Sequence, residues 1–547
     1  MSAKPNVNRW AIAVVAAVGM AGGYLYWRST WVGSSNPLES TKVVPQDALM
    51  AAYVITDEGQ WSKLDEFGTP GAQAAIARTV ADLEANLLAQ TNLDYKKDLQ
   101  PWIGNVTLAI VPSSPTSVAT TSLNSDLLLI VGIKNPFRAW WFTRNLKSQT
   151  ELTLTEFNYK GVTVSQIVPP NGIPTYQATL NHKLVISQQR SAVEKAIDTT
   201  TSESSFLMKS GAKELVRQST KLDNALVHFY LPDYSQTIGP MGNRLSDRPS
   251  LPPVEGVKSV LLSAGVHQEG MRMRFLTEVD PQSIPQSPPV SNKLLNRFPA
   301  ETIALVNGHG IGRSWSTVVG QSQAQPELQG VLLAIRQMFA AVNLDVDREV
   351  FGWMDGEFGL GLISSNQGLL GQLGFGGAVV FETSDRPAAE AMLQKLDAIG
   401  RNVVPFPLAI AERNVSGINV REWKIPLQGA LLGHGWLDDN SLFIAFGGPI
   451  IDAIATPATS LQQSPTFQAI AGSLPNPNHG YLYLDMEQIT SVINTLPFMM
   501  GTPISPQTLD LLNSVRGIGA TGTWTSATQF ESEMLFTLKK TREIVTQ

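Results

Sequence analysis

A charged segment followed by an alternating run of hydrophobic and polar residues occurs twice in the chain. Residues 92–111 read NLDYKKDLQPWIGNVTLAIV, and residues 343–362 read NLDVDREVFGWMDGEFGLGL. Each pattern predicts a helix that ends in a turn and is followed by a strand. Trp102 and Trp353 stand at these junctions, where burial of a large ring against a sheet edge is worth a few kcal/mol. We therefore interpret both tryptophans as structural.

Further residues match between the two halves of the chain, always in the same order. The separation drifts only slightly across the pairs Pro45 and Pro299 (299 − 45 = 254), Trp61 and Trp315 (315 − 61 = 254), Asp94 and Asp345 (345 − 94 = 251), Trp102 and Trp353 (353 − 102 = 251), Gly161 and Gly417 (417 − 161 = 256), and Val257 and Val515 (515 − 257 = 258). Shared strand composition alone does not explain the fixed tryptophan positions. This period is far too long for the repeats of a solenoid. It therefore predicts a duplicated domain, in which the four tryptophans are markers of the repeat.

The same order of elements is expected inside each copy. Strands are predicted at 106–111 and 127–133 in the first copy and at 358–362 and 377–381 in the second. Helices are predicted to begin at Pro136 and Pro387, because proline suits the first helical turn. A hairpin signal lies at Asp438-Asp439-Asn440. Runs of consecutive strands mixed with a few helices predict an α+β fold with largely antiparallel sheets.

Residues 10–27 form an apolar run without charge, bracketed by Arg9 and Arg28. A spanning helix needs about 20 apolar residues, so the run predicts one transmembrane anchor. The cationic residues before it favour a cytoplasmic N-terminus and place the rest of the chain across the membrane. A cleaved signal peptide and a buried core helix are the alternatives. The anchor is preferred because no small-residue cleavage site follows the run.

These patterns divide the chain into six segments. Pro281, Pro285, Pro288 and Pro289 separate the two copies and favour a semi-extended linker. The expected segments are a cytoplasmic N-terminus at 1–9, the anchor at 10–27, a polar spacer at 28–42, a first α+β repeat domain at 43–280, the Pro-rich linker at 281–297 and a second α+β repeat domain at 298–547.

Composition excludes several classes of function. The net charge is −6 (40 Lys and Arg against 46 Asp and Glu) and no long basic run occurs, so nucleic acid is a poor partner. The absence of cysteine removes disulfides, thiolate nucleophiles and Cys-ligated metals together. None of the six histidines belongs to a close-spaced ligand pair. Asp345, Asp347 and Glu349 lack the glycine and the closing glutamate of a calcium loop, so a solvated helix end is favoured. We expect no catalytic residue, no metal site and no cofactor.

One stretch predicts contact with a hydrophobic partner. Residues 486–506 combine an amphipathic pattern with an apolar end at Phe498, Met499 and Met500, and methionine-rich surfaces adapt to variable apolar partners. The alternative is that the stretch packs on its own domain.

The segments VVPQDALMAAYVITDEGQWSKL and NLDYKKDLQPWIG, together with the single N-terminal span, resemble an uncharacterised cyanobacterial membrane-anchored family, domain of unknown function 3352. The second copy departs from the pattern where Phe351-Gly352 replaces Gln100-Pro101. The resemblance implies a photosynthetic prokaryote and a periplasmic or thylakoid-lumenal location. It supplies no catalytic residues.

The expected function is non-catalytic: a scaffold or assembly protein at the membrane, or a binder of a membrane-protein partner or hydrophobic ligand. The alternatives are a hydrolase or other enzyme with a dispersed site in the cleft between the repeats, and a purely structural spacer.

Overall fold

The computed structural model describes residues 37–541 apart from 76, 79–94, 114–124, 148–152, 169–171, 181–182, 203, 210–211, 213–221, 236, 238–255, 285, 323–325, 403–407 and 496–504. The expected anchor at 10–27 lies outside the described residues, as do Phe498, Met499 and Met500. Among the helices of the described part, none is both long enough and apolar enough to cross a membrane.

The chain divides into two compact units. Unit 1 comprises Met1–Gln268 and Met273–Val279, and unit 2 comprises Glu269–Arg272 and Asp280–Gln547. Each unit has its own hydrophobic core.

The sheet of unit 1 has the strand order β4-β5-β6-β7-β3-β2-β1-β8-β9-β10. Its strands are β1 (Met50–Val54), β2 (Ile103–Pro112), β3 (Ser125–Ile133), β4 (Thr153–Tyr159), β5 (Val162–Val168), β6 (Thr175–Leu180), β7 (Lys183–Ser187), β8 (Ala225–Leu231), β9 (Val257–His267) and β10 (Gly270–Val279). From β4 to β9 every neighbouring pair is antiparallel.

Short helices surround this sheet. They are α2 (Pro37–Thr41), α3 (Glu58–Trp61), η1 (Ser62–Glu66), the π-helix η2 (Tyr95–Leu99), α5 (Pro136–Lys147), α6 (Arg190–Ser202) and η3 (Phe206–Met208). Helix α6 buries Ala192, Val193, Ala196 and Ile197, which share one side because residues three and four apart lie on one helical face. This side packs on β6 and β7 in the core of unit 1.

The sheet of unit 2 has the strand order β14-β15-β16-β17-β13-β12-β11-β18-β19-β20, and all these neighbours are antiparallel. Its strands are β11 (Thr302–His309), β12 (Glu357–Ser364), β13 (Phe375–Glu382), β14 (Ala409–Val415), β15 (Ile418–Ile425), β16 (Gly429–Trp436), β17 (Ser441–Phe446), β18 (Tyr481–Asp485), β19 (Val515–Trp524) and β20 (Gln529–Leu538). Adding ten to each strand number of unit 1 reproduces this order, so the two sheets have the same topology.

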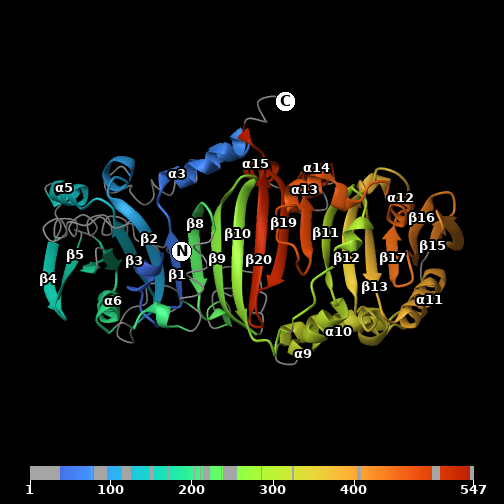
Figure 1. Ribbon diagram of the computed structural model, residues 1–547, viewed down its shortest axis with the longest axis horizontal. Coiled ribbons are helices and arrows are strands. Elements are labelled where there is room, and N and C mark those ends of the chain that lie inside the picture. Colours follow the sequence, from blue (N-terminus) through green and yellow to red (C-terminus); the bar gives the residue numbers. More distant parts are fainter. Residues whose placement is uncertain are drawn as a thin grey trace, which may run out of the picture. The chain divides into compact units, whose positions relative to one another are not determined.

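The helices of unit 2 lie at both ends of its strands in Figure 1. They are η4 (Lys293–Asn296), α9 (Ile311–Gln321), α10 (Pro326–Ala340), the π-helix η6 (Val346–Val350), η7 (Gly371–Leu373), α11 (Arg386–Asn402), α12 (Gly448–Ala455), η8 (Leu461–Gln463), α13 (Pro465–Ala471), α14 (Met486–Thr495) and α15 (Pro506–Ser514). The mixed α+β class with a large antiparallel sheet is therefore confirmed.

Several predicted elements are found where the sequence pattern places them. The four strands predicted from alternation fall within β2, β3, β12 and β13. Helix α5 begins at Pro136, and α11 begins at Arg386, one residue before the expected proline. The hairpin at Asp438-Asp439-Asn440 joins β16 to β17.

The two junction tryptophans occupy equivalent positions after a π-helix. Trp102 and Trp353 are each 1% exposed. The indole Nε1 of Trp102 donates to the carbonyl oxygen of Asp98 at 2.6 Å, and that of Trp353 donates to the carbonyl oxygen of Glu349 at 3.0 Å. Each ring therefore fills apolar space while its one polar atom closes the preceding helical turn.

One face of the unit 2 sheet, which we call the core face, is covered by helices. Leu305, Ile363 and Val380 on this face join the core with residues of α12 and α13. The buried ring of Phe298 lies directly over β12, where a Cβ added at Gly359 or Gly361 would come within 2.6 Å of it. The two glycines thus let the aromatic ring pack against the strand backbone.

Candidate functional site

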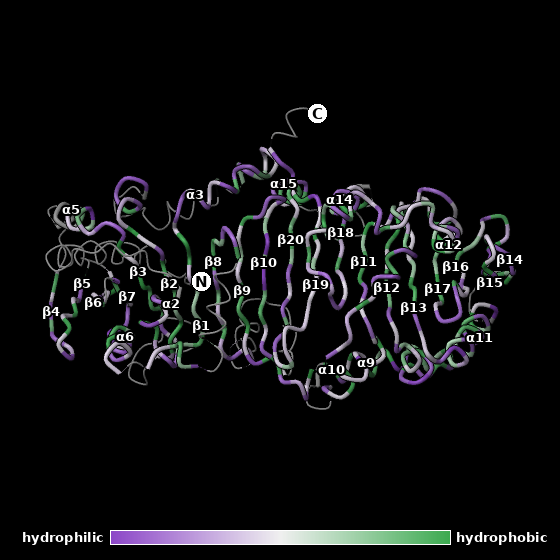
Figure 2. The backbone as a smooth tube through the Cα atoms, viewed as in Figure 1, coloured by the Kyte–Doolittle hydropathy of each residue, from purple (hydrophilic) through white to green (hydrophobic). Residues whose placement is uncertain are grey.

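The opposite face of the unit 2 sheet, which we call the open face, is also apolar. Side chains alternate between the two faces of a strand, so the neighbours of core-face residues point away from the core. Val306, Leu362 and Phe446 are such neighbours, and they are 43%, 43% and 42% exposed. Large apolar side chains therefore meet solvent together on one face, and Figure 2 shows hydrophobic stretches along these strands.

Strand register arranges the open face in two parallel rows. The first row is Phe446, Gly377, Leu362, Ala304, Leu484 and Ile518. The second row is Ile444, Val379, Leu360, Val306, Leu482 and Ala520. Each row crosses neighbouring strands at right angles to the chain direction. Because strands lie about 4.8 Å apart, each row offers a continuous hydrocarbon surface more than about 20 Å long.

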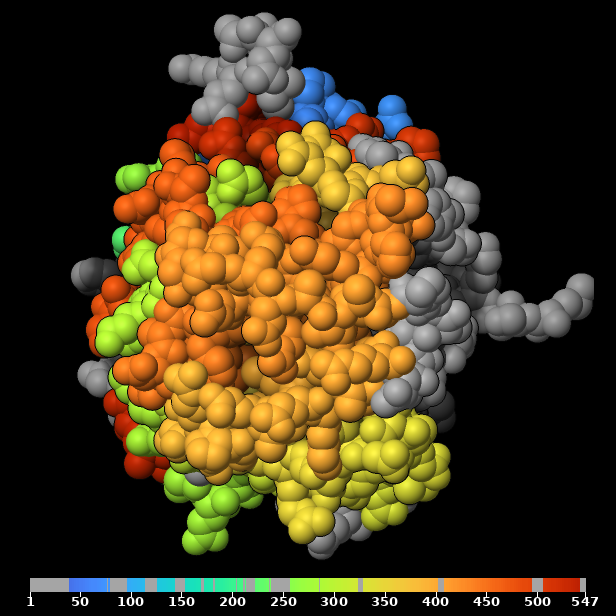
Figure 3. All heavy atoms as spheres, turned by 90° about the vertical axis from the view of Figure 1, so that its right-hand side faces the viewer, coloured from blue at the N-terminus to red at the C-terminus, as the bar shows by residue number. Residues whose placement is uncertain are grey.

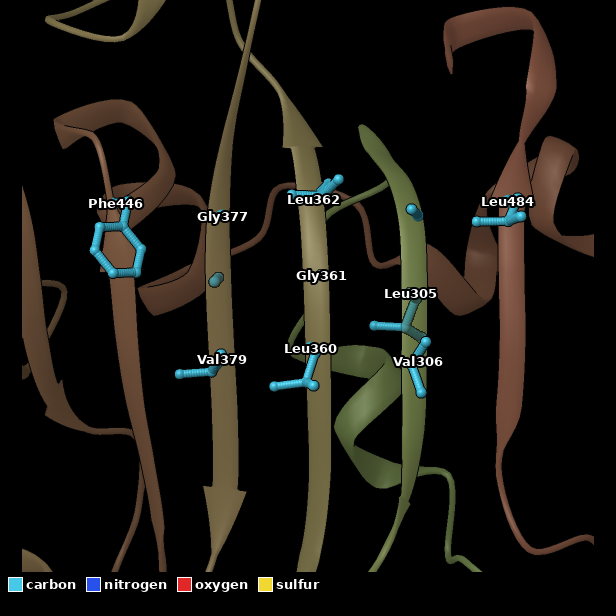
Figure 4. Close-up of a pocket in the computed structure, with 11 residues that line it drawn as sticks. Leu305, Val306, Leu360, Gly361, Leu362, Gly377, Val379, Phe446 and Leu484 are labelled. Carbon is cyan, nitrogen blue, oxygen red and sulfur yellow. The ribbon is translucent and has the colours of Figure 1, made fainter. Parts of the chain in front are cut away.

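A depression of about 420 Å³ lies in the middle of these rows. Its lining residues come from β17, β13, β12, β11 and β18: Phe446, Gly377, Ala378, Val379, Leu360, Gly361, Leu362, Ala304, Leu305, Val306 and Leu484. Figure 4 shows these side chains on five neighbouring strands. The small residues Gly377 and Ala304 alternate with large ones along the first row, which creates the hollow. The volume falls within the range of about 300–1,000 Å³ typical of ligand sites.

A buried cluster bounds the depression on one side. Trp353, Phe381 and Leu442 form this cluster with residues of α11, and Leu360 and Val379 of the second row pack against it. The cluster covers part of the second row, whereas Leu362 and Phe446 of the first row are exposed among the residues that the structure describes.

The chemistry of the depression is restricted to apolar contact. No lining residue carries a nitrogen, oxygen or sulfur atom in its side chain. In the described part of the chain, no group of three or more His, Asp or Glu residues is placed to hold a metal ion. Transfer of a polar group to such a surface forfeits its hydrogen bonds to water, whereas transfer of hydrocarbon gains about 0.8 kcal/mol per methylene.

Unit 1 has the same rows with less exposure. Ala52, Leu108, Leu129, Ile186 and Phe229 lie side by side on neighbouring strands in the positions of the second row. Ile186 is buried and the others are half-buried. Most second-row residues of unit 2 are half-buried as well, so the difference in this row lies at Val306, which is 43% exposed where Ala52 of unit 1 is half-buried.

The four marker tryptophans do not line the depression. Trp61 is 39% exposed, and its Nε1 donates to the carbonyl oxygen of Ile55 at 2.5 Å. Trp315 donates to Asp347 Oδ1 at 2.8 Å and stacks on Phe351 with ring centroids 4.4 Å apart. That these four tryptophans are structural markers of the repeat stays a prediction.

The acidic segment after α10 is held by ion pairs. Asp345 pairs with Arg348 at 2.8 Å, Asp347 with Arg336 at 2.8 Å, and Glu349 with Lys395 at 2.5 Å. The Arg336 guanidinium holds the pKa of Asp347 below its usual value. Each of the three carboxylates is therefore balanced by a basic side chain.

Sequence reasoning missed the residues of the depression, although a signal was present. An antiparallel strand with one solvated face normally alternates between apolar and polar residues. Residues 302–306 and 358–363 are instead apolar or small on both faces, apart from Thr302. Such a pattern indicates strands that bury or present hydrocarbon on both sides.

A two-unit antiparallel α+β architecture with an apolar depression on one sheet thus defines the class of this protein. A family model described as protein of unknown function (DUF3352) matches residues 10–538, and the chain belongs to this family. No curated protein matches the chain.

Three solved structures, crystal forms III, IV and I of TP0453, show a weak similarity. They are 10%, 12% and 13% identical, cover 44%, 47% and 46% of this chain and 79%, 85% and 81% of their own, and each has a TM-score of 0.25. A similarity at this level carries no information about function.

Proposed function

We propose that this protein is a non-catalytic, membrane-anchored binding protein of the periplasm or thylakoid lumen that holds a hydrocarbon chain on the open face of unit 2. The depression lined only by apolar residues is the observation that carries the proposal. The anchor expected at 10–27 supplies a source of such chains, because it keeps the units beside a bilayer. The strand order is the same in both units, which supports an origin by tandem duplication.

The shape of the open face favours an extended acyl chain as the ligand. The rows run straight across the strands, and the hollow at Gly377 and Ala304 lies between the larger Phe446, Leu362 and Leu484. Each methylene buried there contributes about 0.8 kcal/mol, so a chain of ten carbons gains enough to offset its own ordering. An apolar segment of a membrane-protein partner would use the same surface, as expected for a scaffold or assembly protein.

The enzymatic alternative has no comparable support. The depression offers neither a nucleophile nor an acid or base, so bound hydrocarbon would meet no reacting group there. A dispersed hydrolase site between the repeats stays a prediction.

Photocrosslinking in native membranes tests the proposal. A photoactivatable fatty acid fed to the cells should label the wild-type chain, and peptide mapping should place the label on β11, β12 or β13. The Leu362→Glu substitution should reduce labelling at least tenfold, because a carboxylate on the first row would have to be desolvated by the bound chain.

Leu511→Glu is the matched control. Leu511 of α15 and Leu362 are the same residue type and are both 43% exposed, but Leu511 lies outside the depression. Labelling that stays equal in the two variants, or that maps elsewhere in the chain, would refute binding at the open face.

A further inference from the structure

Helix α5 of unit 1 carries large aromatic side chains on its outer surface. The helix follows β3 in the chain and lies beyond the end of that strand (Figure 1). Phe137 is 53% exposed and Trp141 is 57% exposed, which makes them the two most exposed Phe or Trp residues among those that the structure describes. Rings that stay in water forfeit the free energy that their burial would contribute. Two of them side by side therefore indicate a surface that contacts a partner.

The opposite side of α5 holds the helix on unit 1. Ala139 is fully buried and Phe142 is 6% exposed, and the ring of Phe142 lies 5.5 Å from the ring of the buried Trp102. Residues three or four positions apart share a face of a helix. Ala139 and Phe142 therefore lie on one face, and Phe137 and Trp141 lie on another. The buried face fixes the helix, so the two outer rings are not needed to hold it.

The segment that carries these rings is basic. Residues 127–150 contain no Asp or Glu. Their basic residues are Lys134, Arg138, Arg144 and Lys147. Lys134 and Arg138 are exposed, and neither makes an ion pair with a residue that the structure describes. The four cations of this segment stand in a chain whose net charge is −6, so positive charge is concentrated around α5.

Helix α11 is the counterpart of α5 in unit 2. The two helices begin with the same hydrogen bond: Asn135 Oδ1 accepts from the backbone N–H three residues on at 3.0 Å, and Asp385 Oδ1 does so at 3.1 Å. This equivalence gives a separation of 250 (385 − 135 = 250). Ala389 then corresponds to Ala139, and both residues are fully buried.

The counterpart has neither the rings nor the charge. Pro387 and Ala391 stand in the places of Phe137 and Trp141 (387 − 137 = 250 and 391 − 141 = 250). Helix α11 lies at the end of unit 2 that faces the viewer in Figure 3, and residues 385–402 contain three acidic and three basic residues. Since the equivalent helix forms with proline and alanine at these positions, the fold does not require the aromatic, basic surface of α5.

Aromatic rings beside cations without partners suit the surface of an anionic bilayer. Tryptophan and phenylalanine favour the boundary between headgroups and acyl chains, and lysine and arginine are attracted to anionic headgroups. Arg138 and Trp141 are three positions apart on α5, so they are neighbours on the helix surface. A long arginine side chain can therefore reach a lipid phosphate while the neighbouring ring enters the acyl region. The charge of the segment excludes a partner surface that is itself basic.

We propose that the outer face of α5, formed by Phe137, Arg138 and Trp141, docks on the anionic phospholipid surface of the membrane. The two rings enter the boundary between headgroups and acyl chains, and Lys134 and Arg138 pair with phosphate groups. The inference rests on the proposed function only in that the anchor at 10–27 brings the chain to a bilayer. It does not need the binding of hydrocarbon by unit 2, and it gives the chain a second contact with the membrane.

A spin label tests the docking in the full chain, because the absence of cysteine allows a single label at a chosen position. Phe137→Cys carries a nitroxide, and the chain is reconstituted in liposomes of phosphatidylcholine with phosphatidylglycerol. Collisions with oxygen, which is concentrated in lipid, are compared with collisions with a water-soluble nickel chelate. We expect the label to report lipid in these liposomes. Lys134→Gln with Arg138→Gln should lower the ratio of lipid-exposed to water-exposed label about twentyfold, since each cation near an anionic surface contributes roughly a factor of five.

Pro387→Cys is the matched control, because Pro387 is also exposed and has the equivalent position in α11. A label there should report water in every liposome. Trp141→Ala, added to the chain labelled at 137, introduces the residue that unit 2 has at this position, so an unchanged thermal midpoint is expected together with weaker docking.

Three results would overturn the proposal, and they differ in what else they refute. A label at 137 that reports water while the chain still floats with anionic liposomes refutes the docking of α5 and leaves the anchor standing. A chain that does not float with liposomes refutes the anchor as well. A label that reports water in liposomes but is immobilised in native membranes assigns the surface of α5 to a protein partner.

Discussion

Each unit contains a buried histidine, and the two differ in the charge of the groups that surround the imidazole ring. In unit 2, Nε2 of His434 lies 2.9 Å from Oδ1 of the ionised Asp397. His228 of unit 1 has only neutral partners: Ser263 Oγ lies 2.9 Å from its Nδ1, and the ring stacks with that of Tyr53. Burial without a counter-charge lowers the pKa of His228 to about 4.

This lowered pKa predicts acid sensitivity of unit 1. Between pH 6.5 and about 4 the unfolded chain binds a proton at His228 that the folded unit does not, so the free energy of unfolding falls as the pH falls. The full loss is of the order of 3 kcal/mol, at about 1.4 kcal/mol per pKa unit. The measurement is thermal unfolding at several pH values, with hydrogen exchange of peptides from β8 as the readout for unit 1. His228→Gln should flatten the pH dependence, and an unaltered slope would exclude His228 as its cause.

The residues of the depression and of the Asp397–His434 pair explain why sequence reasoning stopped short of them. Asp397 and His434 are 37 positions apart and come from a helix and a strand, so no local spacing connects them. The depression draws on five strands between β11 and β18. In contrast, the strands around 106–111 and 377–381 were predictable, because alternation is a local property of the chain.

At the scale of elements, β12 and β13 carry glycines on opposite faces of one sheet. Gly361 lies under the buried Phe298 ring on the core face. Gly377 lies on the open face, where the nearest atom to an added Cβ is 3.8 Å away, on Phe446. The first glycine allows close packing, and the second forms the floor of the hollow.

These two glycines predict different effects for the same substitution. Gly361→Ala should destabilise unit 2 by about 1–3 kcal/mol, because Phe298 cannot leave a filled core without strain. Gly377→Ala should leave stability nearly unchanged, since its Cβ makes only an ordinary contact, but should weaken acyl binding by filling the hollow. Urea unfolding and fatty-acid photolabelling of both variants measure the two effects. Equal labelling of Gly377→Ala and the wild type would contradict the position proposed for the chain.

At the scale of the whole molecule, the matching strand order of the units contrasts with their different surfaces. Only unit 2 exposes large apolar residues along the rows of its sheet and carries the Asp397–His434 hydrogen bond, among the described residues. Duplicated topology with diverged surfaces is what we expect if both copies preserve the scaffold while each acquires its own contacts. The repeat was visible in sequence because tryptophans and turn glycines keep their places, whereas the diverged surface residues left no pairwise match.

The proposed membrane anchor leads to a prediction about where the protein is found in the cell. The proposed anchor at 10–27 has 18 residues (27 − 10 + 1), and a helix of that length would be about 27 Å long at 1.5 Å per residue, close to the hydrocarbon thickness of a bilayer. The full chain should therefore stay in the membrane pellet after carbonate extraction. Val15→Arg combined with Val18→Arg should prevent insertion, because each arginine costs about 2.5–3.5 kcal/mol at the centre of a span.

Intact mass separates the anchor from a cleaved signal peptide. A retained anchor predicts a mature chain that still contains residues 10–27, and a protease added outside the cytoplasmic membrane should digest units 1 and 2 while sparing a tag at the N-terminus. A soluble product that has lost its first residues would refute the tether, and acyl chains would then have to reach the open face of unit 2 by diffusion through water.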